Sequence, residues 1–423
     1  MAHASVMSGC SRRDAASPDQ PRRGDESLLL FSLPYERLAT FLYNNRRQLP
    51  MDLQRKLFIK KMSREQASSG AEDLQRYSSE AKDELTPLRP PSPPMRNSYS
   101  SDSIDSMVSL PTWEDFFEKR SLLRRGDDTF RVYYTEPKSA ESPVFVFHHG
   151  AGSSALSFAL LASSLVKGFE KDTDGKKNGC GIMAFDCRGH GETRVMEKDY
   201  KLDSLIEDAI FVIQTFREMA NARSNSIFLI GHSLGGAVLT GSCYRLVNEF
   251  GVDVKGLGML DIVEDTAVHS LQGMHTYLSN LPKSFGSLQS AIDWHLKTGL
   301  IRNKTSAEVS VPSYFKRLDS GRYVWRIDLS QTAEYWNTWF VGLSKQFVSA
   351  PTSKLLILAG TDSLDRELMI GQMQGKYQLV VFQDSGHFIQ EDVPKKTALT
   401  LIDFWKRNDK KVVVIRSTWG AKK

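Results

Sequence analysis

The sequence predicts an α/β fold with a mostly parallel central sheet, flanking helices and a helical insertion. From Trp113 onward, short apolar runs alternate with helical stretches, which is the pattern of parallel strands joined by crossover helices. Several of these runs are apolar throughout, as in Val144 to Phe147. Such runs are typical of strands that are buried on both faces of a sheet.

The expected elements follow one another in this alternating order. Strands are expected at 129–134, 144–147, 181–185, 226–230, 256–260, 355–358 and 378–382. Helices are expected at 203–219, 236–241 and 396–407. In the first of these helices, apolar residues recur on one face, as in a helix that packs against a sheet.

The alternation stops between Ile262 and Pro351, in a stretch rich in Trp, Tyr and Phe. We expect a mostly helical insertion at about 262–351 that covers the site as a lid. Ordinary core packing explains many of these aromatic residues equally well. The insertion belongs to one catalytic domain, which is expected at 109–423.

Residues 1–108 are expected to form a mostly disordered extension. The segment from Thr86 to Pro111 is dense in Pro and Ser, a composition that does not offset the entropy lost on ordering. Upstream, residues 32–62 would form one or two short basic helices, which are more often solvated than bound to a membrane. Met51 would itself make a plausible start of the chain.

The bulk composition argues against several classes of protein. The chain has 423 residues, of which 55 are basic and 50 acidic, with a net charge of +5, so neither nucleic acid nor a membrane is an expected partner. The four cysteines form no CxxC pair, and no disulfide scaffold or metal site is expected. Lacking a secretory signal or a long apolar run, the protein is expected in the cytoplasm, the nucleus or both.

A serine motif follows the strand expected at 226–230. Gly231, Ser233 and Gly235 match the pattern G-x-S-x-G, in which the glycines permit a tight turn from strand to helix that exposes the serine. A serine hydroxyl needs a nearby base before it becomes a good nucleophile. The strand before the motif and the small-residue helix after it make Ser233 the expected nucleophile of an α/β-hydrolase.

Such an enzyme also needs N–H groups for the oxyanion that develops on the substrate. The first is expected from the backbone of Leu234, at the start of the helix. The second is expected from the loop after the strand at 144–147, which reads HHGAG. In this loop we favour the amide of Ala151.

His387 is the expected general base. It follows the last expected strand, and the chain order of this fold is nucleophile, acid, histidine. By contrast, His148, His149 and His190 precede the serine.

Two carboxylates compete as the acid that orients the imidazole. Asp362 follows the penultimate core strand, and Asp261 follows the strand before it. Spacing alone favours Asp362 and leaves both residues open.

Several short segments of the chain are more specific than the serine motif. The most specific of them is QMQGK at 372–376. Further similar segments are LIGHSLGGA at 229–237, MLDIVEDTA at 259–267, DTFRVY at 128–133, SALS at 154–157 and IRN at 301–303. Together these segments resemble those of the protein phosphatase methylesterases, in particular the fungal type. The resemblance covers about residues 109 to 407.

The resemblance implies hydrolysis of the methyl ester on the C-terminal leucine of the type 2A protein phosphatase catalytic subunit. The catalytic subunit and its holoenzyme are then partners, and no cofactor is needed. The resemblance also implies that Asp261 is the acid, completing a triad with Ser233 and His387. It further implies that Met373 and Lys376 contact the phosphatase.

The chain departs from the family in the loop at 148–153, which we call the oxyanion loop. Where the family commonly carries a glycine run followed by a histidine, this chain has Gly150 to Ser153, with Ala151 inside. The alanine amide can serve if its backbone angles suit a residue other than glycine. Two other functions stay open: an esterase or lipase acting on a small ester, and a phosphatase-binding module with secondary catalysis.

Overall fold

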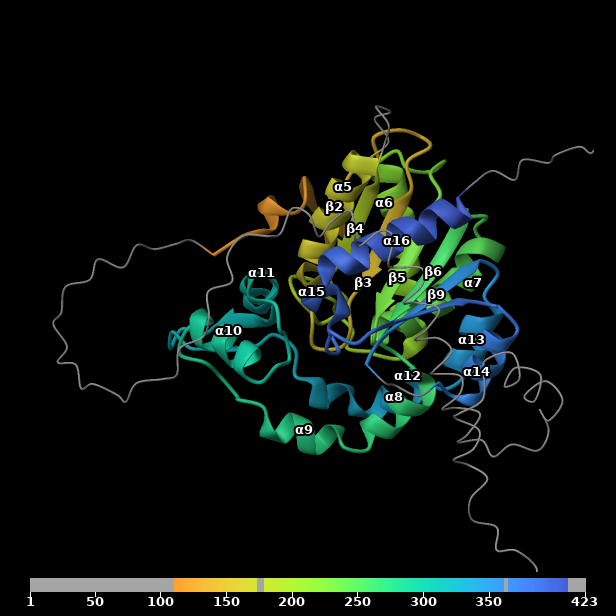
Figure 1. Cartoon of the computed structure of the whole chain (residues 1–423). Helices are drawn as coiled ribbons and strands as arrows, with labels where there is room; N and C mark the ends of the chain where they lie inside the picture. The colour runs from red at the N-terminus through yellow and green to blue at the C-terminus, as the bar shows by residue number, and fades with distance from the viewer. Residues whose placement is uncertain (1–109, 173–178, 361–363, 410–423) are drawn as a thin grey trace, which may run out of the picture. The chain divides into compact units, whose positions relative to one another are not determined.

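The structure is a computed structural model, and it describes residues 110–172, 179–360 and 364–409. Within these ranges, eight strands form one sheet in the order β1-β2-β4-β3-β5-β6-β9-β10 (Figure 1). The strands are β1 (Lys119–Arg125), β2 (Asp128–Thr135), β3 (Val144–His148), β4 (Gly181–Phe185), β5 (Ile227–His232), β6 (Val254–Leu260), β9 (Ser353–Ala359) and β10 (Gln378–Phe382). Each expected strand is present, and β1 was not predicted.

The sheet is antiparallel at one edge and parallel elsewhere. β2 pairs antiparallel with both β1 and β4, whereas every pair from β4 to β10 is parallel. His148 at the end of β3 lies opposite Gly231 in β5, and His232 lies opposite Leu260 in β6. The loops that follow β3, β5 and β6 therefore all leave the sheet at the carboxyl ends of their strands. Ligands bind at these ends in open α/β sheets.

Helices cover both faces of the sheet (Figure 1). In β3, Val144 and Val146 join the core cluster that includes residues of α6 (Leu202–Met219) and α7 (Leu234–Asn248). Phe145 and Phe147 join the opposite cluster, with residues of α5 (Ala159–Asp172) and α16 (Pro394–Asn408). Successive side chains of a strand point to opposite faces, so a wholly apolar strand is buried between two helical layers.

The segment between β6 and β9 is mostly helical. It comprises α8 (Glu264–Leu271), α9 (Met274–Asn280), α10 (Leu288–Lys297), α11 (Lys304–Tyr314), β7 (Phe315–Arg317), β8 (Tyr323–Trp325), η4 (Leu329–Tyr335), α12 (Trp336–Trp339) and α13 (Leu343–Ser349). Many of its aromatic residues form a small separate core around α10, α11, β7 and β8. In this core the rings of Phe315 and Trp325 lie 4.4 Å apart. That this insertion acts as a lid over the site stays a prediction.

The remaining elements are short. They are η2 (Trp113–Asp115), η3 (Ala155–Phe158), α14 (Arg366–Met373) and α15 (Ile389–Asp392). None of the helices in the described ranges combines the length and apolar character needed to cross a membrane. The predictions for residues 1–108 lie outside the described residues.

Candidate active site

Ser233 occupies a sharp turn between β5 and α7. Its backbone has φ 51° and ψ −122°, a conformation that is strained for a residue other than glycine. The flanking glycines are required by space: a Cβ at Gly231 would lie 2.2 Å from Gly235 O, and a Cβ at Gly235 would lie 2.2 Å from His148 O. The turn is held by hydrogen bonds from Ser233 N to Leu260 O (3.0 Å) and from Gly236 N to Ser233 O (2.8 Å).

The structure brings His387 and Asp261 together. His387 Nδ1 lies 2.7 Å from Asp261 Oδ2. Because a carboxylate only accepts hydrogen bonds, Nδ1 carries the proton and Nε2 is left as the basic nitrogen. Asp261 Oδ1 accepts a second hydrogen bond from Ala359 N (2.6 Å), so both carboxylate oxygens are engaged. The side chain of His387 is 49% exposed, whereas that of Asp261 is 7% exposed.

The backbone of Asp261 also fixes this arrangement. Asp261 has φ 51°, a left-handed conformation that aspartate tolerates better than most residues. Its N–H donates to Ile357 O (2.8 Å). Asp362, the acid that spacing favours, lies outside the described residues.

His232 links the serine turn to the base. His232 Nε2 donates to the backbone oxygen of His387 (2.9 Å), and the two rings lie 4.6 Å apart. Burial lowers the pKa of His232 well below its usual value, so the ring stays neutral. This contact, which the sequence did not reveal, holds the main chain of the base beside the nucleophile.

The predicted oxyanion donors lie next to the serine. Leu234 is the first residue of α7, and the first N–H groups of a helix lack intrahelical acceptors. A Cβ at Gly150 would lie 3.0 Å from Ser233 Cβ, which places the loop after β3 against the nucleophile.

The amide of Ala151 is left available in this loop. Gly152 N donates to His190 Nε2 (2.9 Å), and Ser153 N donates to Gly150 O (3.2 Å). The Ala151 N–H, by contrast, donates no hydrogen bond to any of the described residues. Positive φ occurs at Gly152 (78°) but not at Ala151, so the loop accepts an alanine at this position.

Sequence reasoning missed a buried carboxylate beyond the base. The carboxyl oxygens of Glu391 in α15 are hydrogen-bonded to Ser310 Oγ (2.5 Å) and Tyr314 Oη (3.1 Å) of α11. Burial raises the pKa of Glu391 to about 8. Ser153 Oγ donates to Tyr314 Oη (3.3 Å), so one polar chain connects the oxyanion loop, the insertion and the segment after His387.

Met373 and Lys376 lie at the surface, at the C-terminal end of α14. Met373 is 61% exposed, and Lys376 is exposed as well. The turn beneath them is anchored, since Lys376 N donates to Gly371 O (3.0 Å) and the buried Tyr377 donates to Leu368 O (2.9 Å). Their side chains are accessible to another protein, and their contact with a phosphatase stays a prediction.

Among the described residues, neither a cluster of metal-binding side chains nor a disulfide occurs at this site. In the described ranges, no group of three or more His, Cys, Asp or Glu side chains is arranged to hold a metal ion. Cys180, Cys187 and Cys243 are buried free thiols.

Comparisons with known proteins identify similar sequences over most of the chain. A family model described as "Alpha/beta hydrolase family" matches residues 145–399. The chain is 46% identical to protein phosphatase methylesterase 1 of Saccharomyces cerevisiae, over 77% of this chain and 84% of that protein. It is 48% identical to the protein of the same name from Yarrowia lipolytica, over 70% of this chain and 73% of that protein.

A solved structure with little sequence similarity shares the fold. E-2-(acetamidomethylene)succinate hydrolase is similar over 68% of this chain and 99% of its own length, with a TM-score of 0.53 and 16% identity. At this identity the similarity concerns the fold alone.

Proposed function

Because the chain belongs to the protein phosphatase methylesterases, within the α/β-hydrolase family, we propose a specific substrate for it. The substrate is the methyl ester at the C-terminal leucine of the type 2A protein phosphatase catalytic subunit. The observation that carries the proposal is the pairing of His387 with Asp261 (2.7 Å) beside the strained turn at Ser233. This arrangement suits acyl transfer through a serine.

The first half of the reaction forms an acyl-enzyme. Ser233 Oγ attacks the ester carbonyl carbon, and His387 Nε2 takes the hydroxyl proton. The negative charge that develops on the carbonyl oxygen is stabilised by the amides of Leu234 and Ala151. The C–O bond to the methoxy group then breaks, and His387 returns the proton to the leaving oxygen, so that methanol departs.

The second half restores the enzyme. Water loses a proton to His387 and attacks the acyl carbon, and Ser233 leaves as the hydroxyl after taking that proton. The products are the free carboxylate of the leucine and the unmodified serine. Throughout, Asp261 stabilises the imidazolium and holds its Nδ1–H, without taking the proton itself.

Parts of the phosphatase other than its own C-terminal tail are also expected to contact the enzyme. Met373 and Lys376 offer an exposed thioether and a cation on an anchored turn. The substrate would place the enzyme in the cytoplasm, the nucleus or both.

The test is methanol release from the methylated catalytic subunit and from its holoenzyme. Wild type should release methanol from both, whereas Ser233→Ala should release none and still form the complex with the phosphatase. Turnover of p-nitrophenyl acetate without any release from the phosphatase would identify a small-ester hydrolase instead. Binding by wild type without hydrolysis of either substrate would identify a binding module.

A further inference from the structure

We propose that His149 and His190 are positioning residues that aim the Ala151 amide at the oxyanion. They do so by holding the two peptide groups on either side of the Ala151 α-carbon. This inference deepens the proposed function, because it concerns how the same site is organised.

His149 holds the first peptide group. Its Nδ1 lies 2.8 Å from Gly150 O, and the same oxygen accepts from Ser153 N (3.2 Å). Gly150 O and the N–H of Ala151 belong to one planar peptide unit, in which they point in opposite directions. Fixing the carbonyl oxygen from behind therefore fixes the direction of the Ala151 N–H.

His190 holds the second peptide group. Its Nε2 accepts a hydrogen bond from Gly152 N (2.9 Å), which belongs to the peptide unit that joins Ala151 to Gly152. With the peptide units on both sides held, the two backbone dihedrals of Ala151 are set.

The hydrogen bonds also determine the tautomers of both rings. His149 Nδ1 faces a carbonyl oxygen, and its Nε2 accepts from Cys187 N (3.0 Å). His190 Nδ1 likewise faces Arg188 O (2.9 Å). Each ring must then be neutral, with its proton on Nδ1 and a bare Nε2. Burial lowers the pKa of His190 to about 4 and that of His149 well below its usual value.

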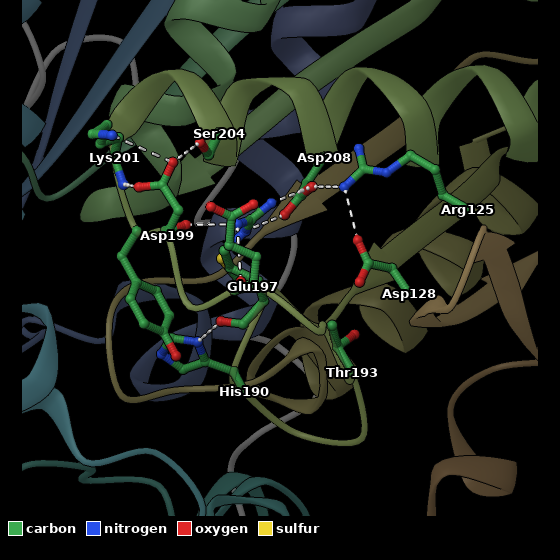
Figure 2. A network of polar contacts seen from close by, with 12 residues as sticks. Arg125, Asp128, His190, Thr193, Glu197, Asp199, Lys201, Ser204 and Asp208 are labelled. Atoms are coloured by element: carbon green, nitrogen blue, oxygen red, sulfur yellow. Dashed lines mark hydrogen bonds and ion pairs between the residues drawn. The ribbon is translucent and has the colours of Figure 1, made fainter.

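Both rings are anchored on the loop between β4 and α6, which is itself held by a buried ion pair. Arg188 donates to Asp208 through Nε (2.6 Å) and Nη2 (2.8 Å). Its Nη1 donates to Asp199 O (2.6 Å). Asp208 also pairs with Arg125, which approaches Asp128, in the network drawn with His190 in Figure 2. This loop provides a rigid support for the oxyanion loop.

Core packing alone does not explain the arrangement. The two rings are packed against each other, with centroids 5.0 Å apart, as any buried rings would be. Yet all four ring nitrogens bond to backbone groups of these two loops. Two apolar rings would fill the same space without fixing either peptide group.

Asparagine and glutamine substitutions separate the two nitrogens of each ring. An asparagine amide nitrogen reaches the place of Nδ1, and a glutamine amide oxygen reaches the place of Nε2. At position 190 the Nε2 acceptor matters, so His190→Gln should keep at least a third of the wild-type kcat and His190→Asn should lose roughly tenfold or more. At position 149 the Nδ1 donor matters, so His149→Asn should be more active than His149→Gln.

The assay measures kcat and KM for p-nitrophenyl acetate, the affinity for a trifluoromethyl ketone and the thermal midpoint. The ketone forms an oxyanion on the serine, so its affinity should fall together with kcat while KM stays within about threefold. The matched control is His295→Gln, because His295 is a buried histidine whose Nδ1 bonds only within α10, to Ala291 O (2.8 Å). This control should lower the thermal midpoint and leave kcat unchanged.

The proposal is supported if glutamine is the more active replacement at position 190 and asparagine is the more active replacement at position 149. The reverse order at either position overturns it, and so do variants that lower the thermal midpoint while kcat and ketone affinity stay at their wild-type values. Should one variant fail to fold, the order at the other position decides. Because the small ester reports on the oxyanion hole alone, this result is independent of whether the phosphatase is the substrate.

Discussion

Replacing Asp261 with asparagine is expected to inactivate the enzyme by reversing the tautomer of His387. Asp261 accepts from two donors, Ala359 N (2.6 Å) and His387 Nδ1 (2.7 Å). An asparagine has one acceptor and one donor in the same places. The backbone N–H of Ala359 cannot change its role, so the amide oxygen stays with it and the amide NH₂ faces the imidazole.

The size of the effect follows from this constraint. With an N–H directed at Nδ1, the neutral imidazole places its own proton on Nε2, where it can no longer accept the proton of Ser233. A wrong tautomer of this kind costs about 10⁴-fold in kcat in a comparable triad, which is about 5 kcal/mol of transition-state stabilisation. The fold should survive, because the side chains have nearly the same volume.

The assay is kcat for p-nitrophenyl acetate, with Asp362→Asn measured in parallel. The matched control is Asp384→Asn, which removes an exposed carboxylate in the loop before His387 that pairs with Lys396 (2.7 Å). An exposed pair contributes at most about 1 kcal/mol, so the control should keep full activity. Full activity of Asp261→Asn together with inactive Asp362→Asn would show that the acid has been misassigned.

Three further predictions concern packing and pH. Gly235→Ala should destabilise the fold by about 3 kcal/mol in urea titrations, because its Cβ would lie 2.2 Å from His148 O, whereas Gly286→Ala should be nearly neutral because nothing lies within 4 Å. Stability should fall as the pH drops from 6.5 toward 4, because burial lowers the pKa of His148 and of His190 to about 4. Over this range the unfolded chain binds protons that the native chain does not. Burial raises the pKa of Glu391 from 4.5 to about 8, so over that range the native chain holds a proton that the unfolded chain releases, and this residue lowers stability as the pH rises. Between pH 6.5 and 8, where the histidines no longer contribute, Glu391→Gln should flatten that decline in urea midpoints, and an unchanged slope would mean that the carboxyl is already ionised in the native state.

The parts of the fold with strong apolar patterns could be predicted from the sequence. The bounds of β4 and β10 match the expected ones, because each is a short apolar run between turns. β1 could not be predicted because it reads KRSLLRR and buries only Leu123. A strand with one buried residue shows no alternation of apolar and polar residues. Helices α8 and α9 bury no residue fully, so their bounds have no apolar pattern from which they could be predicted.

The nucleophile could be predicted from the sequence because its motif consists of neighbouring residues. The acid could not be chosen from sequence spacing. Asp261 comes directly after β6, and Asp362 comes three positions after the end of the neighbouring strand β9. Both are near the carboxyl end of a core strand, so spacing cannot say which carboxylate reaches His387. The position of His149 and His190 ahead of the serine argues against a role as the base. It could not reveal their hydrogen bonds, because these join two loops that are far apart in the sequence.

The most direct test of the central claim is to trap the acyl-enzyme. The methylated phosphatase catalytic subunit would be mixed with the enzyme, quenched in acid within milliseconds, digested and mapped by mass spectrometry. We predict a C-terminal leucine peptide of the phosphatase joined through an ester to the enzyme peptide that contains Ser233, and no such adduct with Ser233→Ala. An adduct on another residue, or methanol release by Ser233→Ala, would contradict the account.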